Sequence, residues 1–201
     1  MVHKKLCARP DIRKTVLAEQ RVLARVAKEA AHDETKHPFI AKLHMSFHDE
    51  HSVYLVLESY VCDLDTRIDY YVSKKRKFPR DLLRFYVAEI CAGLAGLHAM
   101  GIAHRDVKPG NVLVDTEGHV VLADFGLAAS GAKETSLSHP SATLMCTEEV
   151  GSRYFMAPEI LLGSPYNAYA ADWWSVGAVM WNMWTGKVRC CCFSMSCVLV
   201  G

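Results

Sequence analysis

The chain has 201 residues, of which 51% are hydrophobic and 22% are charged, and its formal net charge is +1. This length is near the upper limit of one domain, and the apolar fraction is sufficient for a buried core. Because the net charge is close to zero, we expect neither nucleic acid nor a membrane as a partner. The basic first ten residues lack the apolar run of a signal peptide. We therefore expect a cytoplasmic protein, with the nucleus as a second possibility.

The cysteines and the longest apolar run exclude further classes. Four of the eight cysteines are scattered and four crowd the last twelve residues, and the crowded ones do not have the Cys-x-x-Cys spacing of a zinc knuckle. Reduced cysteines in an intracellular protein are the expectation. The apolar run 176–184 is interrupted by Asn182 and is too short to span a bilayer.

The first third of the chain predicts one helix and two strands. Residues 12–30 have apolar side chains at helical spacing, and residues 41–47 and 52–57 have the pattern of strands joined by a polar turn. The second strand is apolar on both sides, which predicts that both of its faces are covered. Glu19 lies near the apolar edge of the helix, and on these residues alone a solvated side chain is the simpler interpretation.

The rest of the chain is mostly helical. Residues 58–62 break the apolar pattern and are expected to connect the small first part to a larger second part. Helices are predicted over residues 63–73, 80–100 and 169–186, and the basic run 74–77 is expected to be a solvated loop. Gly93 and Gly96 indicate close packing of the second of these helices. Residues 128–147 are expected to form a surface loop, and Pro158 is expected to begin a helix.

The stretch from His104 to Gly126, HRDVKPGNVLVDTEGHVVLADFG, is the most informative part of the sequence. Residues 112–114 and 120–123 are predicted strands, and residues 115–118 form the turn between them. Because a hairpin brings its two ends together, Asp106, Asn111 and Asp124 are expected to share one small volume with Lys108. Such a cluster suits a divalent metal ion held on a phosphate.

These motifs resemble the protein kinase family. His104-Arg105-Asp106 with Asn111 is similar to the catalytic loop, Asp124-Phe125-Gly126 to the metal-binding motif, and Ala157-Pro158-Glu159 to the end of the activation segment. Lys108 and the pair Gly151-Ser152 resemble serine/threonine kinases. The segments AEQRVL (18–23), HPF (37–39) and DWWSVG (172–177) are similar to the AGC group.

The resemblance implies an α+β, protein-kinase-like two-lobe fold. Residues 1–60 would form a partial N-lobe and hinge, with one helix and two strands. Residues 61–187 would form a mainly helical, incomplete C-lobe with the catalytic loop and the activation segment. Residues 188–201 would be an atypical Cys-rich tail.

The implied activity is transfer of the ATP γ-phosphoryl group to Ser or Thr hydroxyls of protein substrates, with ATP and Mg²⁺ as cofactors. Asp106 would orient the substrate hydroxyl, and Lys108 would neutralise charge on the transferred group. Asn111 and Asp124 would hold Mg²⁺. The remaining ATP-binding positions implied by the resemblance are Leu57, the backbones of Glu58 and Tyr60, Leu113 under adenine, and Asp63 for the ribose, with Asp65 as the alternative.

A second set of residues would support the site. Arg105 would pair with a phosphorylated activation segment, and Asp172 would hold the backbone of the catalytic loop. The resemblance also aligns Glu19 with the helix Glu that pairs with the phosphate-binding Lys, which now favours a functional role. Ser152 and Glu159 complete the supporting positions. An apolar column would link the lobes through Leu23, Leu43, His104 and Phe125, for which plain core packing is an equally good explanation.

The chain also departs from the family pattern. It has neither a Gly-rich phosphate loop nor a Val-Ala-Ile-Lys-like segment before Glu19, and Lys4 or Lys5 would be poor substitutes for the missing Lys. Two strands and one helix would leave an apolar face uncovered. The alternative function is therefore that of a catalytically impaired kinase-like fragment acting at most as a binding module.

Both ends of the chain fall inside the family pattern. We therefore expect Met1 to be an internal start and residues 188–201 to be translated intron or a frame error. Glu159 would then lack the Arg that normally pairs with it. The oligomeric state is left open by the sequence.

In the activation segment, Glu148 occupies the usual phospho-Thr position of the AGC group. Thr15 and Ala129 stand where that group usually has a basic residue, so the partners of a phosphate look depleted. We expect Glu148 to supply a fixed negative charge to Arg105. Gly110 replaces an acidic residue before Asn111, so a preference for basic substrates does not follow.

Overall fold

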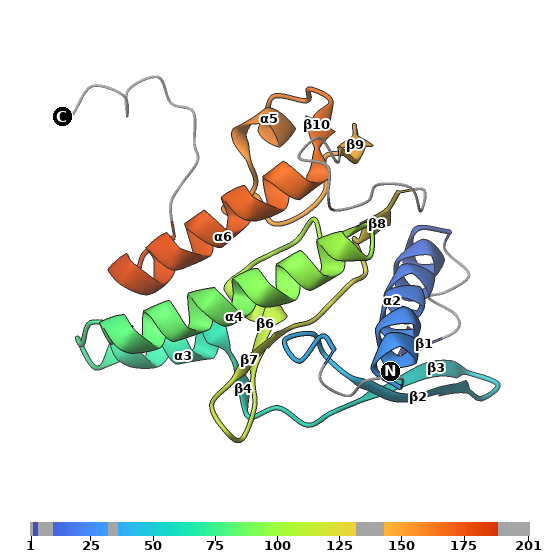
Figure 1. The fold of residues 1–201 in the computed structure, drawn as a ribbon, viewed down its shortest axis with the longest axis horizontal. Coiled ribbons are helices and arrows are strands. Elements are labelled where there is room, and N and C mark those ends of the chain that lie inside the picture. The colour runs from blue at the N-terminus through green and yellow to red at the C-terminus, as the bar shows by residue number, and fades with distance from the viewer. Residues whose placement is uncertain (1, 4–9, 32–35, 132–142, 189–201) are drawn as a thin grey trace.

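The computed structural model describes residues 2–3, 10–31, 36–131 and 143–188. Its first part contains one long helix beside a small antiparallel sheet, and its second part is dominated by helices (Figure 1). The mixed α+β class expected from the sequence is confirmed. Predictions that involve Lys4, Lys5 and the tail after residue 188 lie outside the described residues.

In the first part, helix α2 (Pro10–Ala30) lies beside a sheet of strand order β1-β3-β2. The strands are β1 (Val2–His3), β2 (Leu43–His48) and β3 (Ser52–Leu57). The pairing of β2 with β3 agrees with the predicted hairpin, whereas β1, which pairs with β3, was not predicted.

The expectation that β3 is covered on both faces is wrong. Val56 is 37% exposed, and Phe47 on the neighbouring strand is 50% exposed. Phe47 instead stacks on Tyr54, with 4.8 Å between ring centroids. Helix α2 contacts β2, and no other described helix makes comparable contact with this sheet, so one face remains open.

Among the described residues, the second part contains four α-helices, one 3-10 helix and several short strands. Residues 62–63 form strand β4 and Asp63 caps helix α3, so this helix begins one residue later than predicted. Residues 129–130 and 145–146 of the predicted surface loop form short strands, and residues 132–142 of it lie outside the described residues. The elements are β4 (Cys62–Asp63), α3 (Leu64–Ser73), α4 (Arg80–Ala99), β5 (Ile102–Ala103), η1 (Pro109–Asn111), β6 (Val112–Val114), β7 (Val120–Leu122), β8 (Ala129–Ser130), β9 (Met145–Cys146), α5 (Pro158–Leu161), β10 (Tyr166–Asn167) and α6 (Ala168–Thr185).

The core lies where α4 packs against α6 and β7. Of the apolar residues predicted on one side of α4, Leu83, Ile90, Leu94 and Leu97 are buried, and Val87 is partly buried. A Cβ added at Gly93 would lie 2.5 Å from the backbone oxygen of Phe39, which confirms the close packing expected there. Helix α4 is long and apolar enough to cross a membrane by length and composition, but core helices of globular domains meet the same criterion.

The segment around Phe39 connects the two parts of the molecule. The Leu122 N–H donates to the Phe39 oxygen at 2.9 Å, and the Ala41 N–H donates to the Leu122 oxygen at 2.9 Å. These bonds attach residues 39–41 to the edge of β7. The β6–β7 hairpin is therefore fixed to the first part on one side and to α4 on the other.

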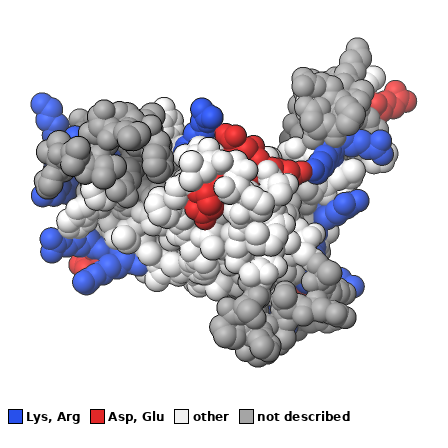
Figure 2. Space-filling view, turned by 90° about the horizontal axis from the view of Figure 1, so that it is seen from above, with Lys and Arg blue, Asp and Glu red and all other residues white. Residues whose placement is uncertain are grey.

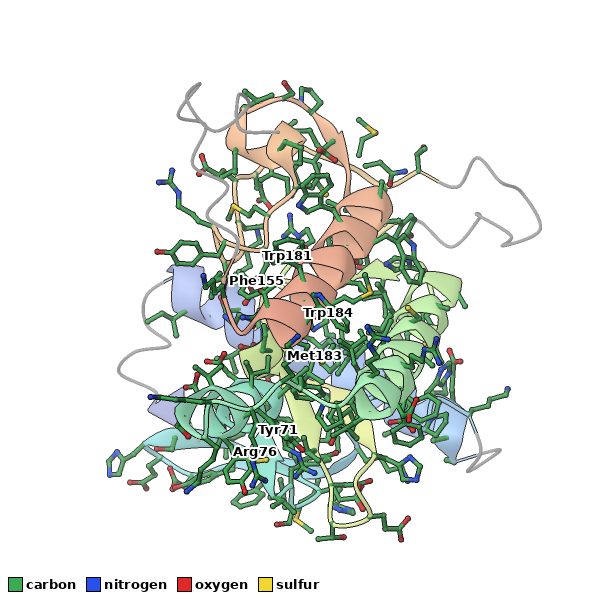
Figure 3. All side chains as sticks on the ribbon, turned by 90° about the vertical axis from the view of Figure 1, so that its left-hand side faces the viewer. Tyr71, Arg76, Phe155, Trp181, Met183 and Trp184 are labelled. Carbon is green, nitrogen blue, oxygen red and sulfur yellow. The ribbon has the colours of Figure 1, made fainter. Side chains whose placement is uncertain are left out.

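Helix α6 is well capped and only partly covered. The Asn167 side chain accepts from the Tyr169 N–H, and Gly186 ends the helix with φ 66°. Its outer side exposes Trp173, Trp174, Met180, Trp181 and Trp184, which line a hollow of about 530 Å³ together with part of α4. Trp181 and Trp184 are labelled in Figure 3. Figure 2, which views the molecule from the side of α6, shows a broad area without charged side chains.

Candidate active site

The β6–β7 hairpin brings the two polar clusters of the sequence together. Val112 pairs with Leu122, and the Ala123 N–H donates to the Asn111 oxygen at 2.9 Å. Asn111 and Asp124 therefore lie at adjacent ends of the hairpin, as predicted. Asp124 has φ 60°, in the left-handed region that non-Gly residues rarely adopt. The turn directs the chain out of β7 and leaves the Asp124 side chain exposed.

The two carboxylate oxygens of Asp106 have different surroundings. Its Oδ2 accepts hydrogen bonds from Lys108 Nζ at 2.7 Å and from Asn111 Nδ2 at 3.0 Å. Its Oδ1 is buried and has no hydrogen-bond partner among the described residues. An unpaired buried acceptor is costly, so this oxygen is a candidate acceptor for a hydrogen bond from a ligand. Lys108 also donates to Ser152 Oγ at 3.0 Å, which joins the activation segment to this cluster.

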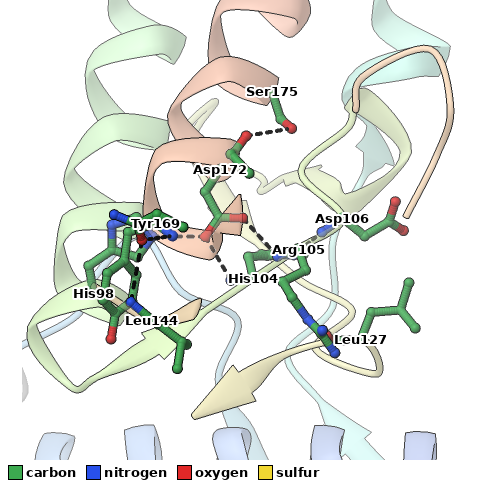
Figure 4. A network of polar contacts seen from close by, with 11 residues as sticks. His98, His104, Arg105, Asp106, Leu127, Leu144, Tyr169, Asp172 and Ser175 are labelled. Atoms are coloured by element: carbon green, nitrogen blue, oxygen red, sulfur yellow. Dashed lines mark hydrogen bonds and ion pairs between the residues drawn. The ribbon is translucent and has the colours of Figure 1, made fainter. Parts of the chain in front are cut away.

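Asp172 holds the catalytic loop from the N-terminal turns of α6 (Figure 4). Its Oδ2 accepts from the His104 N–H at 2.8 Å, and its Oδ1 accepts from the Arg105 N–H at 2.7 Å. His98 Nε2 of α4 lies 2.8 Å from the same Oδ2. Asp172 is 1% exposed, so these contacts satisfy a charge that has almost no access to water. The contact with the catalytic-loop backbone was predicted, but the one with His98 was missed.

Arg105 extends from this loop toward the activation segment. Its backbone has φ 64°, and its Nε donates to the Leu127 oxygen at 2.8 Å. One terminal nitrogen donates to Glu148 Oε2 at 2.8 Å. The structure thus brings together Arg105 and Glu148, as expected from the sequence. The basic residue on the helix side is Lys14, which sequence reasoning missed because it pointed to the neighbouring position, Thr15.

Glu19 lies near Asp124, at one end of the β6–β7 hairpin. It is half-buried and makes no hydrogen bond or ion pair with another described residue that the structure records. Burial raises the pKa of its carboxyl, and the nearby charge of Asp124 raises it further. The two carboxylates therefore repel each other in this arrangement. A cation between them would relieve this repulsion.

Asp124 and Asn111 fit a Mg²⁺ ion that takes most of its oxygen ligands from phosphates and water. The described part of the chain contains no group of three or more His, Cys, Asp or Glu side chains that could hold a metal on its own. The Asn111 amide nitrogen is engaged with Asp106, so the amide oxygen is the atom left for a metal. The donor set suits a metal that arrives with a nucleotide.

The residues expected to contact the nucleotide base and ribose lie along neighbouring strands. Asp63 of β4 pairs with Leu113 of β6. Asp63 Oδ1 accepts from the Thr66 N–H at 2.7 Å, so this carboxylate caps α3 and keeps its other oxygen for a ligand. Leu57 and Tyr60 are half-buried against the same core. The Glu58 N–H donates to the Lys42 oxygen at 3.2 Å, so only its carbonyl stays available to a base.

The remaining supporting residues have distinct surroundings. His104 and Phe125 are fully buried with ring centroids 5.3 Å apart, and Leu23 belongs to the same core, with Leu43 packed against it. These four residues therefore lie in or beside the core, and His104 and Phe125 are in contact. Glu159 in α5 makes no ion pair with another described residue that the structure records.

Comparison with known proteins identifies the family. A sequence profile described as "Protein kinase domain" matches residues 3–193. The chain belongs to the protein kinase family, and its relatives are serine/threonine kinases of the AGC group, as the sequence motifs indicated.

Individual relatives agree with this assignment. "Serine/threonine-protein kinase Sgk3" of Rattus norvegicus is 35% identical over 186 residues, which cover 92% of this chain and 34% of the relative. "Serine/threonine-protein kinase AtPK1/AtPK6" of Arabidopsis thaliana is 42% identical over 151 residues, which cover 75% of this chain and 30% of the relative. "Protein kinase 3" of Dictyostelium discoideum is 38% identical over 173 residues, 80% of this chain and 18% of the relative. The chain thus spans about a third or less of the length of these relatives.

Proposed function

We propose that this site transfers the γ-phosphoryl group of ATP to Ser or Thr hydroxyls of protein substrates. The observation that carries the proposal is the state of Asp106. One carboxylate oxygen is fixed by Lys108 and Asn111, and the other is buried without a partner among the described residues. A substrate hydroxyl that donates to this free oxygen would be aligned for attack on a phosphoryl group bound beside it.

The proposed mechanism relies on positioning and charge. The substrate oxygen forms a bond to the γ-phosphorus as the bond from phosphorus to the β-phosphate oxygen breaks, and ADP leaves. Asp106 accepts the hydrogen bond, and finally the proton, of the substrate hydroxyl. Lys108 lies 2.7 Å from Asp106 Oδ2, where its positive charge would stabilise the phosphoryl group during transfer.

Asn111 and Asp124 would hold Mg²⁺, which when bound neutralises charge on the phosphates. Leu113 would pack against adenine and Asp63 would bind the ribose, with Leu57 at the back of the pocket and the backbones of Glu58 and Tyr60 beside the base. Asp172 supports the reaction indirectly, because it fixes the backbone from which Asp106 projects.

The alternative is a kinase-like binding module that does not transfer phosphate. One observation favours it: burial and the nearby charge of Asp124 raise the pKa of Glu19, and no described Lys or Arg pairs with Glu19. In the alternative, ATP with Mg²⁺ would bind at Asp124 and Asn111, but the phosphates would be poorly oriented.

A paired measurement separates the two functions. Phosphorylation of a mixed Ser/Thr peptide library is compared for the wild-type chain, Asp106→Asn and the exposed control Asp69→Asn. We expect Asp106→Asn to lower the transfer rate by about 10²–10⁴-fold, with the control unchanged. The thermal shift with Mg-ATP should be the same in all three proteins. A shift with Mg-ATP but no transfer by the wild-type chain would establish the binding module, and equal transfer by Asp106→Asn would contradict the proposed mechanism.

A further inference from the structure

Three distant segments of the chain meet at the carboxylate of Glu148. Arg105 of the catalytic loop donates to its Oε2 at 2.8 Å, and Lys14 of α2 donates to its Oε1 at 3.1 Å. The Glu148 backbone oxygen accepts from the Tyr166 hydroxyl of β10 at 3.0 Å. Glu148 is thus fixed through its backbone and cross-links the first part of the molecule to the catalytic loop through its side chain.

The ion pair between Arg105 and Glu148 is the stronger of the two side-chain contacts of Glu148. The Arg105 side chain is only 7% exposed, and a cation with so little access to water needs an anionic partner. Burial is the largest influence on the pKa of Arg105 and opposes its charged form, but the hydrogen bond that Arg105 donates to Glu148, together with the contributions of Tyr166 and Cys146, leaves the pKa raised. Hydrogen bonds from Arg105 and then Lys14 lower the pKa of Glu148, so the carboxylate remains ionised under ordinary conditions.

The contact with Lys14 is weaker, but it connects Glu148 to helix α2 and therefore to the helix that carries Glu19. Lys14 is 75% exposed and Glu148 is 50% exposed, and ion pairs between such side chains contribute little by themselves. The importance of this contact is geometric, because Lys14 lies on the same helix as Glu19, about 1.4 turns before it. Holding the Lys14 end of α2 also restrains the orientation in which Glu19 faces Asp124.

We propose that Glu148 is a built-in anion that positions α2 against the catalytic loop, so that this arrangement needs no phosphoryl group on residues 143–152. Glu148 acts as a positioning residue through Arg105 and Lys14. This role concerns the order of the site in the absence of nucleotide. It therefore stands or falls separately from the proposed phosphoryl transfer.

Amide hydrogen exchange of the phosphatase-treated chain, measured without ATP, tests the inference. We expect Glu148→Gln to increase exchange in the catalytic loop and in the first turns of α2 on the order of tenfold, because Arg105 loses the partner of its buried charge. Glu148→Asp should restore protection at least in part. Lys14→Met should raise exchange in α2 alone, and since Lys14 is an exposed side chain, this variant does not endanger folding.

Glu149 offers a matched control, because it is the next residue, carries the same charge and pairs only with the exposed Arg153 at 3.3 Å among the described residues. Glu149→Gln should exchange like the wild type. Equal exchange in Glu148→Gln and Glu149→Gln would overturn the inference. So would loss of α2 and catalytic-loop protection in the wild-type chain on phosphatase treatment, since a phosphoryl group would then be supplying the anion. If Glu148→Gln does not fold, Lys14→Met decides: unchanged exchange in α2 overturns the cross-link, and increased exchange there supports it.

Discussion

Replacing Asp172 by Asn should destabilise the protein, because the Asp172 carboxylate holds the backbone of His104 and Arg105. The Asp172 carboxylate is 1% exposed and accepts from the backbone N–H groups of His104 and Arg105 at 2.8 and 2.7 Å. In Asn, one of these oxygens becomes an NH₂ group that faces an N–H donor, so at least one buried donor loses its partner. This loss costs about 1–3 kcal/mol, and the remaining bonds lose their charge assistance.

The total expected loss is about 2–5 kcal/mol, which is a large part of the roughly 5–15 kcal/mol by which domains are stable. Urea unfolding followed by tryptophan fluorescence measures it, and Trp173, whose ring centroid is 5.6 Å from that of His98, lies beside the network. Asp69→Asn, at an exposed position of α3, should change stability by less than about 0.5 kcal/mol. A loss in Asp172→Asn no larger than in this control would refute the reasoning, because Asp172 would then not be holding the loop.

Two further predictions concern helix packing and pH. Gly93→Ala should destabilise the protein by about 1–3 kcal/mol, because the new Cβ would meet a backbone oxygen at 2.5 Å. At Gly177, in the interior of helix α6, an added Cβ would meet nothing within 4 Å, so Gly177→Ala should stabilise the protein by up to about 1 kcal/mol. Urea unfolding measures both variants. Equal changes in the free energy of unfolding of Gly93→Ala and Gly177→Ala would contradict the prediction. Glu19→Gln should raise the melting temperature at pH 7, because the folded-state pKa of Glu19 is raised and its charge is unfavourable there. As the pH falls through the folded-state pKa of Glu19 toward its unfolded-state pKa, the wild-type carboxylate takes up a proton, and the difference in melting temperature between Glu19→Gln and the wild type should disappear. A difference in melting temperature that does not change with pH would contradict this prediction.

Local patterns in the sequence were sufficient to predict the main helices and the β6–β7 hairpin. The β6–β7 hairpin follows from two short apolar runs around a polar turn, and its prediction placed Asn111 and Asp124 together because both lie next to its strands. The helices α4 and α6 follow from apolar spacing that is continuous over many residues. These features depend on residues that are close together in the chain, so their pattern can be recognised in the sequence without knowledge of distant contacts.

Contacts between distant segments depend instead on the folded chain. Lys14 reaches Glu148 across 134 residues, and the local sequence shows that Lys14 is basic but not that its side chain is directed toward Glu148. The exposed face of β3 was mispredicted because apolar alternation shows what a strand can bury, not whether another element is present to cover it. Likewise, the unpaired oxygen of Asp106 arises because Lys108 and Asn111 both bind the other oxygen. That is a matter of side-chain direction, which only the tertiary structure defines.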